Sequence, residues 1–109
     1  MDTLHLYRAR EDVSEAVHKL GGKIVHVHLR DYPNNPNREK YEASPEEEIP
    51  GRGDVNFPKI LKSLMEVGYG RATDIDVIGA FTYPLSRQMG IAAEARGYIH
   101  RWLQELKGQ

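Results

Sequence analysis

Residues 23–31, KIVHVHLRD, constrain the fold most, because this short stretch is rich in β-branched residues and alternates in polarity. Side chains two positions apart on a β-strand point to the same face. One face is apolar and needs helices or a second sheet against it; it holds Val25, Val27 and Leu29. The other face becomes polar towards the C-terminal end; it holds Ile24, His26, His28 and Arg30. Parallel α/β enzymes keep their chemistry at that end of a strand, so the histidines are either hydrogen-bonded core or rim residues or parts of a site.

The size and charge of the chain set limits on its class. Its 109 residues suffice for one domain with a modest core, which we place over 1–109. A net charge of −1 gives no basic field for nucleic acid, and no apolar run is long enough to cross a membrane. The sequence contains no cysteine, which excludes disulfides and thiolate metal sites. We therefore expect a cytoplasmic protein without a nucleic-acid or membrane partner.

Helix signals alternate with strand signals along the rest of the chain. Residues 12–20 and 56–67 each start with a capping residue and stop at glycine. A last helix is expected from residue 84 or 85 to about 106, with Ala92 on its apolar side. Together with a strand at 73–79, this alternation predicts parallel strands covered by helices.

The strand expected at 73–79, TDIDVIG, carries two aspartates on one face, Asp74 and Asp76. A carboxylate in the middle of an apolar strand is costly to bury unless it is paired or bound to a metal. Asp76 is therefore a candidate ligand or catalytic residue.

Two loop segments also carry polar residues that suggest a site. Asp2 and His5 lie three positions apart, so they can converge on one metal ion if a turn holds them; otherwise they belong to a frayed terminus. The long connection 30–55 is polar, and connections of this length are either functional lids or solvated insertions. Its tripeptide Arg52-Gly53-Asp54 matches a cell-adhesion motif, which we interpret as coincidence.

Five segments, taken in order, resemble the C-terminal part of the xylose isomerase-like TIM-barrel superfamily: DTLH, HVHLRD, PGRGDVNFPKIL, LMEVGYG and IDVIGA. This superfamily includes sugar and sugar-phosphate isomerases and epimerases, inosose dehydratases and apurinic endonucleases. The resemblance implies an α/β fold, a partial (β/α)8 TIM barrel made of C-terminal βα units, about strands 7 and 8 with helices 6 to 8. Such a part needs completion, either by oligomerisation or by a missing N-terminal half.

The resemblance also assigns roles to residues. Asp2, His28 and Asp76 fall on family ligands of a divalent metal ion (Mn²⁺, Mg²⁺, Co²⁺ or Zn²⁺), and His5 falls on a substrate-binding histidine. Asp76 also takes the place of a glutamate that is the catalytic acid/base in the epimerases, although its side chain is one methylene shorter. Glu47 and Ile49 stand where the endonucleases carry an extra Asp-x-His pair, which disfavours that branch.

Three hypotheses about function follow from the resemblance. The favoured one is a C-terminal fragment of a divalent-metal-dependent sugar or sugar-phosphate isomerase/epimerase-like protein, inactive alone because the other catalytic glutamate is missing. The reaction type would be proton transfer next to a carbonyl through an enediolate, and an inosose dehydratase-like lyase is an alternative. The second hypothesis is a short protein that is catalytic as a composite assembly. The third is a non-catalytic, self-assembling structural or binding module, and a homo-oligomer is expected throughout.

Overall fold

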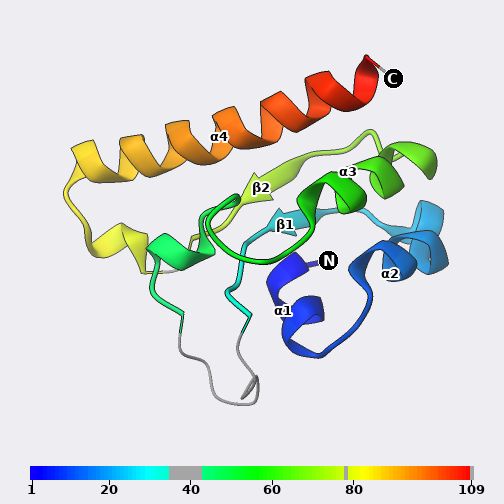
Figure 1. Cartoon of the computed structure of the whole chain (residues 1–109), viewed down its shortest axis with the longest axis horizontal. Helices are drawn as coiled ribbons and strands as arrows, with labels where there is room; N and C mark the ends of the chain where they lie inside the picture. Colours follow the sequence, from blue (N-terminus) through cyan, green and yellow to red (C-terminus); the bar gives the residue numbers. More distant parts are fainter. Residues whose placement is uncertain (35–42, 78, 109) are drawn as a thin grey trace.

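The computed structural model describes residues 1–34, 43–77 and 79–108. Most of its regular structure is in four α-helices: α1 (Thr3–Arg8), α2 (Val13–Leu20), α3 (Phe57–Glu66) and α4 (Leu85–Lys107). Three short 3-10 turns accompany them: η1 (Gly21–Lys23), η2 (Glu46–Glu48) and η3 (Ala80–Thr82). The strands β1 (Val27–Leu29) and β2 (Thr73–Ile75) pair in parallel, with His28 opposite Asp74. Figure 1 shows α4 along the β2 side of this small sheet and α1 on the β1 side.

The expected partial (β/α)8 barrel is wrong. In the described part of the chain, the sheet has two strands of three residues each, and helices dominate. Strands this short offer too few ladder hydrogen bonds to build barrel units. Before β1 the buried and exposed positions are the reverse of the prediction. Ile24, expected on the polar face, is 6% exposed, and Val25, expected on the apolar face, is 63% exposed. Only Val27 and Leu29 keep the predicted apolar face.

The edge of β1 opposite β2 is extended by a single bridge, between Asp2 and His28. The backbone nitrogen of Met1 donates to the carbonyl of His26 at 3.0 Å, and the nitrogen of His28 donates to the carbonyl of Met1 at 2.8 Å. Because alternate residues of a strand direct their backbone groups to opposite sides, β1 lies between Met1–Asp2 and β2. The residues before α1 are thereby fixed beside the histidines.

The helix starts follow the sequence signals. The side chain of Asp12 caps α2 by accepting from the nitrogen of Glu15 at 3.0 Å, and that of Asn56 caps α3 by accepting from the nitrogen of Lys59 at 3.2 Å. Gly21 ends α2 with φ +50, a conformation that L residues with a Cβ rarely adopt. These two predicted helices are confirmed to within one residue at each end.

The core lies on the Val27 and Leu29 face of the sheet, between α2, α3 and α4. Its buried members include Leu4, Val17, Phe57, Ile60, Leu64 and Ile99. In α4 the buried face is centred on Ala95 and Ile99. Ala92, predicted on that face, is exposed, because α4 packs against α3 and β2 through its C-terminal half.

The described parts of the 30–55 connection are largely packed into the body, which corrects the solvated alternative for them. The carboxylate of Asp31 is 0% exposed and organises the turn. Its Oδ1 accepts from the backbone nitrogens of Tyr32 at 2.9 Å and Val55 at 3.0 Å, and its Oδ2 accepts from those of Gly51 at 2.8 Å and Gly53 at 2.9 Å. We call this arrangement the Asp31 turn. Residues 35–42, to which the predicted lid extends, lie outside the described residues.

The glycines of the Asp31 turn have no room for a side chain. A Cβ on Gly53 would lie 2.5 Å from Oδ1 of Asp31 and 2.7 Å from the carbonyl oxygen of Tyr32. Burial raises the pKa of the Asp31 carboxyl, while the four N–H donors act in the opposite direction. The tripeptide Arg52-Gly53-Asp54 is part of this structure, because Gly53 approaches Asp31 and Arg52 pairs with Glu94 at 2.6 Å.

Candidate metal centre

Three of the predicted site residues meet at the polar face of the sheet. His28 lies in the middle of β1, Asp76 follows β2 directly, and Asp2 sits beside β1 at the start of α1. Nδ1 of His28 is 3.5 Å from Oδ2 of Asp76 and 3.8 Å from Oδ2 of Asp2. One ligand atom from each of the three lies within 4.8 Å of the others. We call these residues the three-ligand cluster.

The two oxygens of Asp2 have different environments. Oδ1 caps α1, accepting from the backbone nitrogens of Leu4 at 2.9 Å and His5 at 3.2 Å. This cap orients the carboxylate, so that Oδ2 faces His28 and Arg30. One helix cap therefore fixes the direction of a candidate metal ligand.

A buried cation lies beneath this cluster. Arg30 is 2% exposed, and its Nη1 is 3.4 Å from Oδ2 of Asp2 and 3.4 Å from Nε2 of His5. Its Nη2 donates to Oε1 of Glu48, which is 1% exposed. The guanidinium thus connects the cluster to η2 and offsets part of the carboxylate charge.

The three-ligand cluster borders a hollow that solvent reaches. The hollow is lined by Met1, Asp2, His5, His26, His28, Arg30 and Asp76. The side chains of His28 and Asp76 are 41% and 36% exposed, and that of Asp2 is 15% exposed. His5, the predicted substrate-binding residue, lies at the same hollow and is exposed. The structure therefore brings all four predicted site residues together.

The donor set fits a divalent cation. Two carboxylate oxygens and one imidazole nitrogen suit Mn²⁺, Mg²⁺, Co²⁺ or Zn²⁺. Donors on one octahedral ion at bond lengths near 2.1 Å stand about 3 Å apart. Separations of 3.5 and 3.8 Å therefore need only small side-chain rotations, and the solvent side leaves room for water or a ligand.

Sequence reasoning did not select three neighbours of the cluster as site residues. The sequence does place Arg30 and His26 on the same face as His28, because each is two positions away from it along the strand. Glu48 gave no signal, because it lies in an acidic run that usually stays in solvent. Its burial comes from the Arg30 pair and from its carbonyl oxygen, which accepts from the nitrogen of Asp31 at 2.8 Å.

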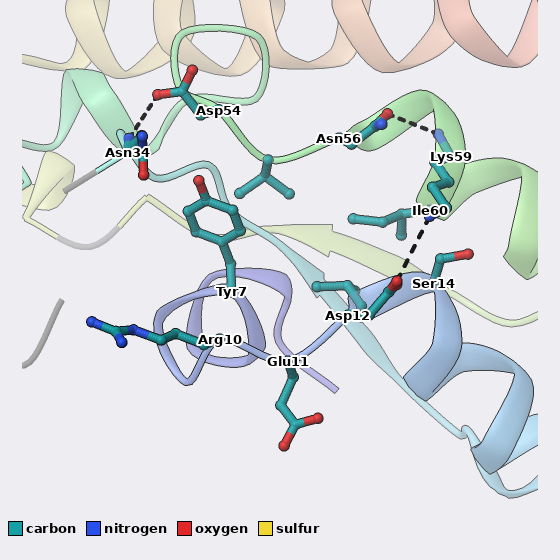
Figure 2. Close-up of a pocket in the computed structure, with 12 residues that line it drawn as sticks. Tyr7, Arg10, Glu11, Asp12, Ser14, Asn34, Asp54, Asn56, Lys59 and Ile60 are labelled. Carbon is teal, nitrogen blue, oxygen red and sulfur yellow. Dashed lines mark hydrogen bonds and ion pairs between the residues drawn. The ribbon is translucent and has the colours of Figure 1, made fainter. Parts of the chain in front are cut away.

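A larger cavity of about 570 Å³ lies away from the three-ligand cluster. Figure 2 shows it between the α1–α2 connection and the start of α3, beside Tyr7 and Asp54. Its polar lining serves the helix starts: Asp12 caps α2, and the ammonium of Lys59 lies 3.7 Å from Oδ2 of Asp12. This lining is therefore explained by local structure.

The comparisons with known proteins give no match: no family model, no curated protein and no solved structure matches the chain. In the described ranges, no helix has the length and apolar character needed to cross a membrane.

Proposed function

We propose that this chain binds a divalent metal ion through Asp2, His28 and Asp76. The observation that carries the proposal is the convergence of these residues, which come from the start of α1, from β1 and from the end of β2. The Asp2 cap and the β1–β2 register direct three donor atoms into one solvent-accessible hollow.

The reaction we propose for the site is proton transfer next to a carbonyl, on a sugar or sugar phosphate, as the resemblance implies. When bound, the ion supplies polarisation of a carbonyl oxygen. The Asp76 carboxylate would take the proton from the carbon next to the carbonyl and return a proton to the neighbouring carbon or to the opposite face of the same carbon. His5, beside Arg30 at the hollow, contacts the substrate hydroxyl or phosphate groups. Asp76 is the one catalytic carboxylate that the resemblance assigns to this chain, and the other catalytic glutamate of that superfamily has no counterpart here. We therefore expect the chain to be inactive alone, and this proposal places it in the cytoplasm.

Titration with Mn²⁺ tests the metal site. We expect His28→Ala and Asp76→Asn to weaken Mn²⁺ binding by at least about tenfold, because each removes one of three ligands. Glu105→Gln is the matched control, since Glu105 is an exposed carboxylate of α4 that lies outside the three-ligand cluster. Equal Mn²⁺ affinity in all three variants and the unaltered chain would refute the proposed site.

Deuterium exchange tests the chemistry. A ketose phosphate incubated with the chain and Mn²⁺ in D₂O should incorporate deuterium at the carbon next to the carbonyl only if a base acts there. Exchange that is lost in Asp76→Asn and in chelator would show that the chain is catalytic as an assembly. Mn²⁺ binding without exchange at any protein concentration is the result expected of an inactive fragment, and it also fits a non-catalytic binding module.

A non-catalytic, self-assembling module is a second candidate, favoured by the apolar surface around the start of α4. Phe81, Leu85 and Met89 are 78%, 71% and 64% exposed. Large apolar side chains left exposed in one region often mark contacts between proteins. Sedimentation equilibrium should show a discrete oligomer that Leu85→Lys dissociates; a monomer at all concentrations would remove this candidate.

A further inference from the structure

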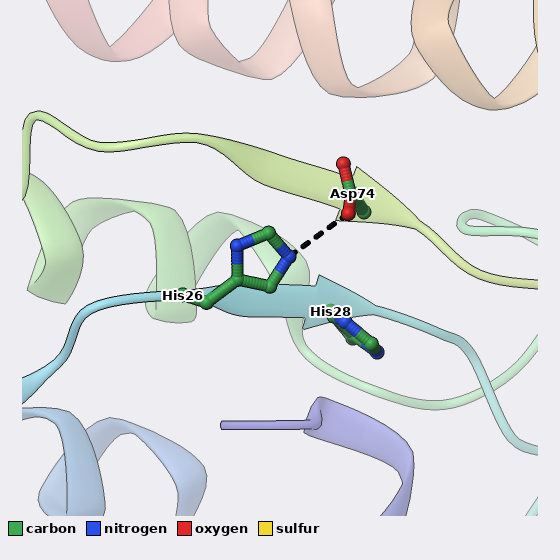
Figure 3. A group of neighbouring side chains, drawn as sticks. All are labelled: His26, His28 and Asp74. Atoms are coloured by element: carbon green, nitrogen blue, oxygen red, sulfur yellow. Dashed lines mark hydrogen bonds and ion pairs between the residues drawn. The ribbon is translucent and has the colours of Figure 1, made fainter.

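His26 and Asp74 form a pair that the three-ligand cluster does not use. Nε2 of His26 is 2.9 Å from Oδ2 of Asp74, across the two strands. The register places Asp74 opposite His28, so the three residues share one face of the sheet. Figure 3 shows the imidazole of His26, which directly precedes β1, pointing towards the carboxylate of Asp74 on β2, with His28 further along β1.

The two histidine rings are close enough to serve one ion. Their centroids are 5.0 Å apart and the ring planes are inclined by 81°. A nitrogen from each ring and an oxygen of Asp74 all lie within 4.8 Å of one another. Donors on one tetrahedral Zn²⁺ with bonds near 2.05 Å stand about 3.3 Å apart, so small rotations bring this set to bonding distance.

Stability does not explain the pair. The side chains of His26 and Asp74 are 42% and 63% exposed. Ion pairs this exposed contribute little to folding, because water screens them. Exposure on the open face of the sheet does leave the donor atoms accessible to an ion from solution.

We propose that His26, His28 and Asp74 form a second metal site, which binds Zn²⁺ or a similar nitrogen-preferring divalent ion. We call it the two-histidine cluster. Two imidazoles and one carboxylate favour Zn²⁺, Ni²⁺ and Cu²⁺, whereas the two carboxylates of the three-ligand cluster also suit Mn²⁺ and Mg²⁺. We therefore infer two adjacent clusters in this chain that prefer different metal ions.

The clusters share His28, and this coupling rests on the function proposed above. A neutral imidazole offers one lone pair, so His28 ligates one ion at a time. Zn²⁺ at the two-histidine cluster takes His28 away from Asp2 and Asp76, and Mn²⁺ at the three-ligand cluster takes it away from His26. The coupling is reciprocal, since each ion must lower the affinity for the other by the same factor.

The test is a Zn²⁺ titration by calorimetry in a chain whose three-ligand cluster is impaired. Asp76→Asn should still bind Zn²⁺, and adding His26→Asn to it should weaken that binding at least about tenfold. Adding His100→Asn instead, an exposed histidine of α4, should change nothing. Circular dichroism checks that each variant remains folded. Equal Zn²⁺ affinity with and without His26, or no Zn²⁺ binding by Asp76→Asn, would overturn the second site.

A Mn²⁺ titration of His26→Asn separates this proposal from the previous one. The single variant should bind Mn²⁺ as the unaltered chain does, because His26 is not a member of the three-ligand cluster. If Zn²⁺ binding depends on His26 while Mn²⁺ does not bind at all, the second site stands and the three-ligand cluster fails. If Mn²⁺ binding depends on Asp76 while Zn²⁺ ignores His26, only the second site fails.

Discussion

Asp31 and Asp76 both follow a strand of the same sheet, and their surroundings differ sharply. Both oxygens of Asp31 are saturated by four backbone N–H groups, and the residue is 0% exposed. Asp76 is 36% exposed, and its Oδ2 lies 3.5 Å from a histidine nitrogen. A carboxylate saturated with backbone donors has no lone pair to offer a ligand, whereas a half-exposed one beside an imidazole does. The Asp31 turn is therefore structural, and the three-ligand cluster is available for chemistry.

Among the variants that test this comparison, we expect Asp31→Asn to have the largest effect on stability. The amide nitrogen would replace one acceptor oxygen and leave two backbone N–H groups buried without an acceptor. We expect a loss of about 3–5 kcal/mol in the free energy of unfolding, measured with urea. Asp74→Asn is the control and should change stability by less than about 0.5 kcal/mol, since Asp74 is exposed. Similar effects of the two changes would contradict a structural role for Asp31.

Gly53→Ala tests the same turn by steric means. The new methyl group would press on the Asp31 carboxylate and on the Tyr32 carbonyl, so the backbone must shift. We expect a loss of about 3 kcal/mol. Gly90→Ala in α4, where nothing lies within 4 Å, should instead gain about 0.5–1 kcal/mol from helix propensity. If Gly53→Ala leaves the thermal unfolding curve unchanged, the backbone of the turn can shift to accommodate a methyl group at little cost.

The role of Asp76 can be tested by measuring the stability of the chain with and without Mn²⁺. Mn²⁺ at 100 times its dissociation constant should stabilise the chain by about 2.7 kcal/mol, because the folded state binds it. Asp76→Asn should abolish most of this gain. In chelator the same change should be close to neutral, because a pair as exposed as Asp76 and His28 contributes little to folding. Equal unfolding curves for the variant and the unaltered chain in Mn²⁺ would argue against a ligand role for Asp76.

The smallest effect concerns a surface pair that braces the Asp31 turn from outside. The hydrogen bond from Arg52 lowers the pKa of Glu94, so the ionised form is favoured in the folded state. The resulting stability is present above the pKa of the unfolded chain and is lost as pH falls through the lower folded value. Glu94→Gln should therefore unfold slightly more easily near neutral pH and match the unaltered chain in acid. A difference that persists in acid would indicate another cause.

The sequence predicted the local features, and which polar residues lie near one another, more closely than the architecture. The caps at Asp12 and Asn56 act within a few residues, so propensity alone finds them. The spacing of two between the histidines and between Asp74 and Asp76 correctly placed these pairs on one face of the sheet. The barrel expectation came from the resemblance, and it failed because the described sheet has two strands of three residues each. Val25, which the alternating pattern placed on the apolar face, is 63% exposed.

The Asp31 turn escaped prediction for a different reason. Its hydrogen bonds join Asp31 to backbone groups at Gly51, Gly53 and Val55, more than a dozen residues later in the chain. Backbone donors carry no residue-type signal, so a sequence cannot show which carboxylate will receive them. The same holds for Glu48, whose burial depends on a distant Arg30.

The cap formed by Asp2 has a consequence for motion. Helix α1 has six residues, and a helix of that length has little stability of its own. Two amide protons of its first turn, on Leu4 and His5, are held by the same carboxylate that faces His28. Fixing that carboxylate on an ion would slow the opening of the first turn, so hydrogen exchange at these two amides would report occupancy of the hollow in real time. The exchange rates of these two amides would then measure the fraction of chains that hold the ion.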